Sequence, residues 1–420
     1  MPRERRRPAA DSADAGRGSG RRRRRRWPVL VAVAVVAAAA GLWAARDPVA
    51  SGAARLRDWT VDAAAAWSDW SGTLQDLAAG EPVPTTIPVE ATPLRDSQSL
   101  LVVVGGADAA AFALVSIPPE GDPGLVMLPG SLLVLAPGYG EFTLNETLGL
   151  GGAGLVALAV ANQLGLRIDA VAALPAGEFE AVLGEPLAVE VPVALLLEDE
   201  NGEQRIIAEG RQRLDPDLVE LLLTRRGTGD EFDLLRRQEA AWEAVIAGVG
   251  DLPGLADRIA AASDDPRVAA EALRQLAETE DPGIGSPPVE RVSLDANREA
   301  FLLAAGAGDG YLSGALSHLL LAGGARPRVE VLNGNGRPGS ADAVVADLVR
   351  AGFFVIETGN ADRFDYPVSQ VIAQGPDSES AAERARDVIG VGEVLLEATS
   401  PSTVVDVSII VGTDISAGEG

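Results

Sequence analysis

The 420-residue sequence contains no cysteine and no lysine, and it has a single histidine, His318. The absence of cysteine excludes disulfide bonds, thiol nucleophiles and cysteine-ligated metals. Without lysine there is no Schiff-base lysine and no P-loop lysine, and one histidine cannot build a multi-histidine metal site. Any catalysis must therefore use carboxylates, arginines, hydroxyls, backbone groups or a hard metal on oxygen ligands.

The charge is divided unevenly along the chain. Residues 1–26 carry eleven arginines and three acidic residues, a net charge of +8, whereas residues 27–420 carry 24 arginines and 58 acidic residues, a net charge of −34. A body this acidic repels phosphate backbones, so we do not expect nucleic acid among the partners.

An uncharged segment at residues 27–45 follows six consecutive arginines at 21–26. A helix of that length spans roughly 28 Å, about the thickness of a membrane core. Because arginines flank one side, we expect a cytoplasmic tail at 1–26, a single transmembrane helix at 27–45 and an extracellular C-terminus. Two alternatives remain open, a signal peptide cleaved near residues 49–53 and a buried helix of a soluble protein.

The body of the chain divides into three segments. Residues 46–93 predict a juxtamembrane helix and then an extended linker rich in proline and threonine. In residues 94–323, apolar stretches of strand and helix length alternate, which predicts an α/β sandwich. Residues 326–414 predict a small domain with the order β-α-β-β-α-β-β, whose first helix starts at Ser340 and ends at Gly352.

Individual elements are expected at the following positions. The predicted strands of the larger domain cover 99–104, 112–117, 125–128, 170–174 and 189–197, the last of them broken by Pro192. Its predicted helices cover 151–164, 178–183, 216–223 and 232–249, followed by mostly helix over 251–322.

The small domain resembles the LytR C-terminal domain of bacterial envelope proteins. The segments that carry the resemblance are VEVLNGNG at 329–336, PG at 338–339, AGF at 351–353, GNAD at 359–362 and DVSIIVGTD at 406–414. The resemblance implies a place in the cell envelope. Residues 334–339 also spell G-x-G-x-x-G, but the domain is too small for a Rossmann pair, so we interpret them as a turn.

Residues 99–250 resemble the LytR-CpsA-Psr (LCP) phosphotransferase domain, which transfers a glycopolymer from a polyprenyl-pyrophosphate carrier to peptidoglycan, usually with Mg²⁺. The matching segments include LVSIPP at 114–119, APGYG at 136–140, LN at 144–145, GG at 151–152 and RQ at 237–238. The resemblance implies an α/β/α sandwich with an apolar pocket. The implied ligands of the lipid pyrophosphate are Asn145, Arg225, Arg226, Arg237 and Gln238.

The positions that carry the chemistry of the LCP family differ in this sequence. Ala110 stands in place of the metal-side aspartate, Gly130-Ser131 in place of an Arg-Asp step, and Leu234 in place of an arginine. Arginine holds two phosphate oxygens at once, and a carboxylate holds the metal. Asp108 could take the metal position after a shift of two residues, and Mg²⁺ is then the cofactor of an active enzyme.

We therefore expect a membrane-anchored extracytoplasmic envelope protein with a degenerate LCP fold, which binds or scaffolds in cell-wall polymer assembly. Its expected partners are the membrane and a polyprenyl-linked glycan or peptidoglycan. Two alternatives stay open, an active Mg²⁺-dependent phosphotransferase and a structural interaction module without a lipid pocket. The arginines at 225, 226, 236 and 237 could instead pair with nearby carboxylates, namely Asp230, Glu231, Asp233 and Glu239.

Overall fold

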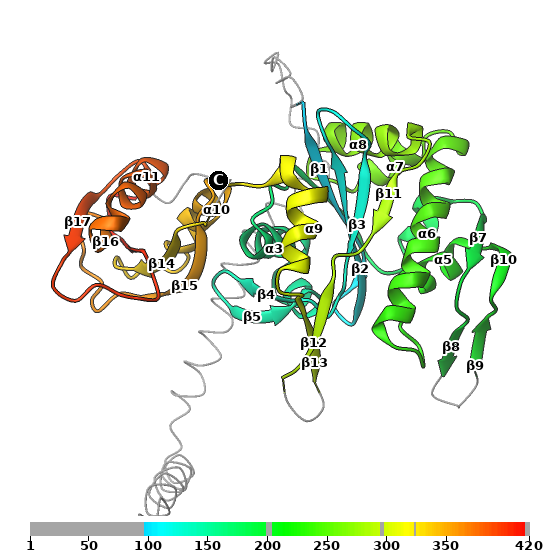
Figure 1. Cartoon of the computed structure of the whole chain (residues 1–420), viewed down its shortest axis with the longest axis horizontal. Helices are drawn as coiled ribbons and strands as arrows, with labels where there is room; N and C mark the ends of the chain where they lie inside the picture. The colour runs from blue at the N-terminus through cyan, green and yellow to red at the C-terminus, as the bar shows by residue number, and fades with distance from the viewer. Residues whose placement is uncertain (1–95, 199–203, 295–297, 323–324, 416–420) are drawn as a thin grey trace, which may run out of the picture. The chain divides into compact units, whose positions relative to one another are not determined.

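The computed structural model describes residues 96–198, 204–294, 298–322 and 325–415 (Figure 1). The expected cytoplasmic tail, transmembrane helix and juxtamembrane segment lie outside these residues. The structure has a mixed α/β fold with two five-stranded sheets.

The first sheet has the order β11-β3-β2-β1-β6. Its strands are β1 (Gln98–Gly106), β2 (Ala109–Ile117), β3 (Gly124–Leu128), β6 (Ala170–Leu174) and β11 (Gly283–Gly285). Strand β1 pairs antiparallel with β2 and parallel with β6. Seven of the nine residues of β1 are buried, which explains why its central residues, 100–104, form an uninterrupted apolar stretch.

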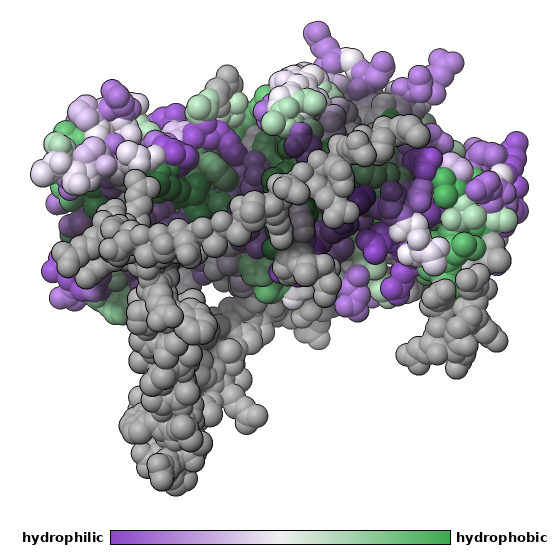
Figure 2. All heavy atoms as spheres, turned by 60° about the horizontal axis from the view of Figure 1, so that its bottom comes forward, coloured by the Kyte–Doolittle hydropathy of each residue, from purple (hydrophilic) through white to green (hydrophobic). Residues whose placement is uncertain are grey.

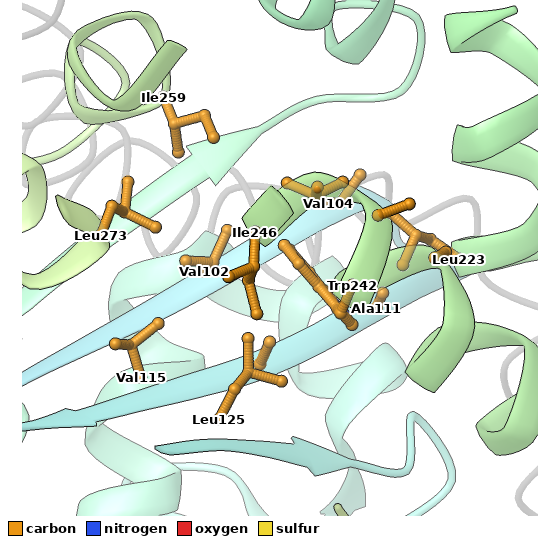
Figure 3. Close-up of a cluster of buried hydrophobic side chains, with 14 of the residues drawn as sticks. Val102, Val104, Ala111, Val115, Leu125, Leu223, Trp242, Ile246, Ile259 and Leu273 are labelled. Atoms are coloured by element: carbon orange, nitrogen blue, oxygen red, sulfur yellow. The ribbon is translucent and has the colours of Figure 1, made fainter. Parts of the chain in front are cut away.

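Helices cover both faces of this sheet. One face carries α5 (Pro216–Thr224), α6 (Glu231–Asp251), α7 (Leu255–Ala260) and α8 (Pro266–Glu278). Figure 3 shows Trp242 and Ile246 of α6 among the buried side chains of this face. The other face carries α3 (Leu144–Leu164) and α9 (Ala307–Ala315) over a second core.

The other elements of this part of the chain are short hairpins and helices. They are β4 (Leu133–Ala136) with β5 (Gly140–Thr143), β7 (Leu187–Val191) with β10 (Gly210–Leu214), β8 (Leu195–Glu198) with β9 (Gln204–Ile207), β12 (Val289–Ser293) with β13 (Glu299–Leu303), α4 (Phe179–Leu183) and the 3₁₀ turn η1 (Ser317–Leu319).

One element prediction in this region is confirmed and another is wrong. The strand expected at 189–197, broken by Pro192, is two strands, β7 and β8, which pair with different partners on either side of this proline. Proline cannot donate to a ladder, so the pairing changes there. The segment at 251–322 contains three strands besides its helices, and the shortest, β11, has the sequence GIG, which gives no strand pattern.

Helix α3 begins earlier than predicted. A capping box between Thr143 and Glu146 starts it at Leu144, and Gly151 and Gly152 interrupt it with non-helical backbone angles. The predicted helix at 151–164 is therefore its second half. Among the described helices, α3 is the one long and apolar enough to cross a membrane, and 44% of its apolar window is buried inside the fold.

The second sheet has the order β15-β14-β18-β16-β17. Its elements are β14 (Arg328–Asn333), α10 (Asp342–Arg350), β15 (Phe354–Asn360), β16 (Gln370–Gln374), the 3₁₀ turn η2 (Pro376–Ser378), α11 (Glu379–Ile389), β17 (Glu393–Glu397) and β18 (Val407–Val411). Strands and helices follow the predicted order β-α-β-β-α-β-β.

The face of the molecule shown in Figure 2 is mostly hydrophilic. On this face, hydrophobic residues of the described chain lie mainly in recesses.

Ser340 does not cap the first helix of the domain at 326–414, contrary to the prediction. Its hydroxyl donates to the carbonyl of Arg337, and α10 starts at Asp342 without a side-chain cap. In the G-x-G-x-x-G loop before α10, two backbone amides form local hydrogen bonds. The N–H groups of Asn335 and Gly336 donate to the side chain of Asn333, so the loop does not present them to a phosphate.

Asn162 joins α3 to the edge strand β15. This side chain is fully buried. Its Nδ2 donates to the carbonyl of Val355 at 2.8 Å, and its Oδ1 accepts from the amide of Val355 at 2.9 Å. One amide side chain thus satisfies both backbone groups of an edge residue.

His318 is bound to a buried serine, and its titration gives a first test of the structure. Its Nε2 lies 2.8 Å from the hydroxyl oxygen of Ser116, which is 3% exposed. Burial, with a smaller contribution from the Arg167 guanidinium, lowers the pKa of His318. The folded chain therefore favours the neutral imidazole, so this contribution to stability is present above the ordinary histidine pKa and is lost as the pH falls through it.

We expect the imidazole pKa in the folded full-length chain to lie below that in the urea-unfolded chain. Because the sequence has one histidine, NMR should show a single imidazole signal. Arg167→Gln should raise the pKa by a small amount, since Arg167 is the lesser cause. A folded pKa at or above the unfolded value would contradict this environment.

Candidate anion-binding site

A buried arginine organises the loop between α5 and α6. Arg237 is 1% exposed, and its Nη2 donates to the carbonyl oxygens of Arg225 at 3.2 Å and Arg226 at 2.7 Å. Burial lowers the pKa of this guanidinium. Arg237 therefore holds the loop from inside the fold, a different role from the direct contact with a ligand that the resemblance implied.

Arg225 and Arg226 are exposed at the surface of this loop. Neither forms an ion pair with any described carboxylate, whereas Arg236 pairs with Asp233. Pairing with nearby acids, the alternative left open by the sequence, thus applies to Arg236 and not to these two. The loop presents two exposed cations on a strongly acidic chain, an arrangement that favours binding of an anion.

Polar atoms without partners lie beneath the loop, on α6. Gln238 donates from Nε2 to the carbonyl of Leu223 at 2.6 Å, but its Oε1 has no hydrogen-bond partner. The Nε of Arg237 and the Nε1 of Trp242 are also buried and unpaired. These three polar atoms lie on the helix that holds the arginine loop.

Asn145 lies in the first turn of α3 and connects three elements. Its side-chain Oδ1 accepts from the backbone amide of Ala110 at 3.2 Å. Its backbone N–H donates to the carbonyl of Gly130 at 2.9 Å. A Cβ atom at Gly130 would lie 2.6 Å from Nδ2 of Asn145. Asn145 thus fills the space into which a side chain at position 130 would extend.

Asp108 lies in the exposed two-residue turn between β1 and β2. In the described ranges, neither this turn nor any other place brings together three or more acidic or histidine side chains that could hold a metal ion. A single exposed carboxylate is a weak ligand for Mg²⁺, which takes an octahedral set of oxygens. The role of Asp108 as a metal ligand stays a prediction.

Glu231 is a functional candidate that the sequence indicated only as an ion-pair partner. It is 9% exposed. Burial raises the pKa of this carboxyl, while the charge of Arg226 acts in the opposite direction. Its position at the start of α6, directly after the cap residue Asp230, was the available signal, but the sequence could not show that it is buried.

These residues meet at one end of the first sheet. Asn145 contacts Gly130 and Ala110, and Glu231 contacts Ser131. Thr224, directly before Arg225, lies beside the β1–β2 hairpin, since its Cγ2 is 3.0 Å from a Cβ atom placed at Gly105. The structure therefore brings the separate sequence candidates into one neighbourhood, with Arg237 and Gln238 beneath it.

An apolar pocket was expected between the sheet and the helix at 151–164. Buried side chains fill that space, among them Leu101, Phe112, Val156 and Val160. A cavity of about 500 Å³ lies at the margin of this core, and its lining includes Leu132, Leu164, Leu303, Leu312, Asp309 and Arg326. The space between the sheet and this helix is therefore packed, and the cavity lies beside it.

Comparison with known proteins identifies the smaller part of the chain. Residues 326–414 match the family model of the LytR cell envelope-related transcriptional attenuator. The LytR C-terminal domain predicted from the sequence is thereby confirmed, with these bounds. The model covers the second sheet and its helices and does not extend to the candidate site.

Solved structures similar to the chain are LCP proteins, as the resemblance of residues 99–250 predicted. Bacillus subtilis TagV is 16% identical, with a TM-score of 0.44, over 54% of this chain and 98% of that one. B. subtilis YwtF (TagT) with bound octaprenyl pyrophosphate is 17% identical, with a TM-score of 0.39, over 56% and 95%. A LytR-Csp2A-Psr enzyme from Actinomyces oris is 19% identical, with a TM-score of 0.40, over 51% and 88%. No curated protein matches the chain.

Proposed function

We propose that this protein is a membrane-anchored, extracytoplasmic envelope protein that binds a polyprenyl-pyrophosphate-linked glycopolymer without transferring it. In this proposal the pyrophosphate binds to Arg225 and Arg226, and the protein acts as a carrier or scaffold during cell-wall assembly. The observation that carries it is the pair of exposed arginines, which form no ion pair with a described carboxylate and whose backbone carbonyls are held by the buried Arg237.

The arrangement suits binding of a diphosphate. Two neighbouring arginines can each meet two phosphate oxygens, and charge-assisted hydrogen bonds of this kind contribute about 1.5–3 kcal/mol each. Both side chains are exposed and neither forms an ion pair with a described carboxylate, although the charge of Arg226 acts on the buried Glu231. The remaining acidic surface repels anions elsewhere, so the arginine pair is the place where an anion is expected to bind.

The same residues argue against transfer. Phosphoryl transfer depends on fixed positive charge and metal around the reacting phosphate. Here Ala110, Gly130 and Leu234 replace the charged positions of the LCP family, and Asn145 fills the space beside Gly130. Glu231, a buried carboxyl in the same neighbourhood, adds negative charge when ionised. Binding without turnover is therefore the outcome that this site supports best.

The test is binding of octaprenyl pyrophosphate to the full-length chain in lipid nanodiscs at 150 mM salt, measured by native mass spectrometry and fluorescence titration. The double variant Arg225→Ala, Arg226→Ala should bind about 100-fold more weakly, since it loses two charge-assisted contacts. Its matched control is Arg274→Ala, Arg350→Ala, which removes two exposed arginines that already pair with Asp257 and Asp347 and should bind like the wild type.

Each outcome separates the candidate functions. Equal loss in both double variants would mean that overall charge, rather than this site, attracts the lipid. Absence of binding in the wild type would favour the structural interaction module. Mg²⁺-dependent release of phosphate or transfer of glycan, with TagT as the positive control, would overturn the non-catalytic proposal.

A further inference from the structure

Strand β17 forms an open edge of the LytR C-terminal domain. It is the last strand in the order β15-β14-β18-β16-β17 and pairs parallel with β16. Figure 1 shows it at the rim of the sheet. At the opposite edge, Asn162 occupies the backbone groups of Val355 in β15. A side chain of α3 therefore forms hydrogen bonds with the β15 edge of this sheet, and the β17 edge has no such contact among the described residues.

The ladder with β16 leaves part of the β17 backbone unpaired. The amide of Glu393 donates to the carbonyl of Ser369, on the β16 side. Because strand residues alternate, Leu395 and Glu397 face β16 in the same way, and the N–H and C=O groups of Val394 and Leu396 face outward. Within the described residues these four groups have no hydrogen-bond partner.

The side chains of β17 do not protect this edge in the usual ways. Leu395 and Leu396 are 38% and 44% exposed, and the pairing shows no bulge. Natural edges are usually blunted by proline, lysine, a bulge or a covering element. Here only the glutamates at 393 and 397 interrupt an apolar centre, Val394-Leu395-Leu396.

The charges at the two ends define what can pair with this edge. Glu393 and Glu397 lie on the same face as Leu395, since they are two residues apart in a strand. The Glu397 carboxylate accepts from the amides of Thr399 and Ser400, which lowers its pKa and keeps it ionised. A strand laid along β17 therefore meets a negative charge, three apolar residues and a second negative charge.

This pattern disfavours a second copy of the chain. Antiparallel pairing of β17 with itself, centred on Leu395, places Glu393 of each copy opposite Glu397 of the other. Like charges directly opposite each other in a sheet are destabilising. A strand with basic residues at those two positions makes two favourable pairs instead.

We propose that β17 is a docking edge for a partner protein that adds a β-strand with the pattern basic–apolar–apolar–apolar–basic. Backbone hydrogen bonds to Val394 and Leu396 supply the pairing, and Glu393 and Glu397 select the basic partner. The pattern reads the same in both directions, so it holds for parallel or antiparallel addition. This inference is independent of the arginine site, because it uses only residues of the second sheet.

The probe is the acetylated and amidated peptide Arg-Val-Leu-Val-Arg, titrated into the full-length chain in nanodiscs by calorimetry and by NMR of the Val394 and Leu396 amides. The charge-reversed peptide Glu-Val-Leu-Val-Glu serves as a mimic of a second copy. We expect the basic peptide to bind at least about tenfold more tightly, because two opposite-charge pairs replace two like-charge pairs. The difference should shrink as salt is added.

Two variants test the edge in different ways. Leu396→Pro removes an outward N–H and leaves the ladder with β16 intact, so it should abolish binding of the basic peptide. Glu393→Arg changes an exposed side chain and leaves each peptide with one favourable and one unfavourable charge pair, so the roughly tenfold preference for the basic peptide should disappear. Phe364→Ala, which removes another exposed apolar side chain of the domain, is the control and should bind like the wild type.

Equal binding of the two peptides, or binding unaffected by both β17 variants, would overturn the proposal. So would self-association in sedimentation experiments that Leu396→Pro abolishes, because the occupant would then be a second copy. The charge variant keeps the test decisive if the proline variant does not fold.

Discussion

Replacing Asn162 with alanine should lower the free energy of unfolding by about 3–5 kcal/mol. The side chain is fully buried and satisfies both the amide and the carbonyl of Val355. Its removal leaves two backbone groups without partners in a site that excludes water, and an unsatisfied buried group costs about 1–3 kcal/mol. The small cavity left by the lost amide adds to this cost.

Hydrogen exchange gives the direct measurement. The amide of Val355 should exchange about 100-fold faster or more in Asn162→Ala, whereas amides of β1 should change less, because they lie in the first sheet. The neighbouring Gln163→Ala is the matched control. Gln163 accepts one hydrogen bond, from the amide of Leu135 at 3.2 Å, so its loss should cost about 1 kcal/mol. Equal effects of the two variants would mean that the Asn162 contact contributes little.

Replacing Gly227 with alanine should destabilise the fold by about 3 kcal/mol or more and should also weaken binding at the arginine loop. Gly227 directly follows Arg226 and has φ of +65°. A Cβ atom there would lie 2.4 Å from the carbonyl oxygen of Leu196 and 2.8 Å from a methyl carbon of Leu195. Because the nearest atom belongs to the backbone, relief requires the loop to move.

Gly177→Ala separates the strain of a positive φ from the steric clash of the new Cβ atom. Gly177 also has a positive φ, +84°, but a Cβ atom there meets nothing within 4 Å. Its substitution should cost only the conformational strain, about 1 kcal/mol. Urea unfolding followed by circular dichroism measures both. A Gly227→Ala variant as stable as Gly177→Ala would contradict the close approach, and a destabilised variant with unchanged octaprenyl-pyrophosphate binding would separate the loop from the proposed site.

Much of the first sheet could be predicted because its strands are buried on both faces. Strands such as β2 and β3 are continuous apolar stretches, and no other short element has that composition. The strands β11 and β12 could not be predicted in the same way. Three residues of Gly-Ile-Gly and the half-exposed sequence VERVS carry little hydrophobic signal, so their strand geometry follows from the partners that they pair with.

The candidate site shows the same division. The sequence named Arg225, Arg226 and Arg237 as ligands of the pyrophosphate, without distinguishing their roles. Tertiary packing distinguishes them, because Arg237 is turned inward to hold two carbonyls, whereas Arg225 and Arg226 are exposed and form no ion pair with a described carboxylate. Asn145 stays a predicted ligand, and its contact with the space beside Gly130 depends on residues far apart in the chain.

The sequence by itself determined the chemistry that is available. The lack of cysteine and lysine, the single histidine, the acidic body and the motifs of the LytR C-terminal domain are properties of composition and order. Only the tertiary structure decided which charges are free, which edge of the second sheet is covered by Asn162, and which edge is open at β17. The reason is physical: burial and pairing depend on contacts between distant segments, and those contacts exist only once the chain has folded.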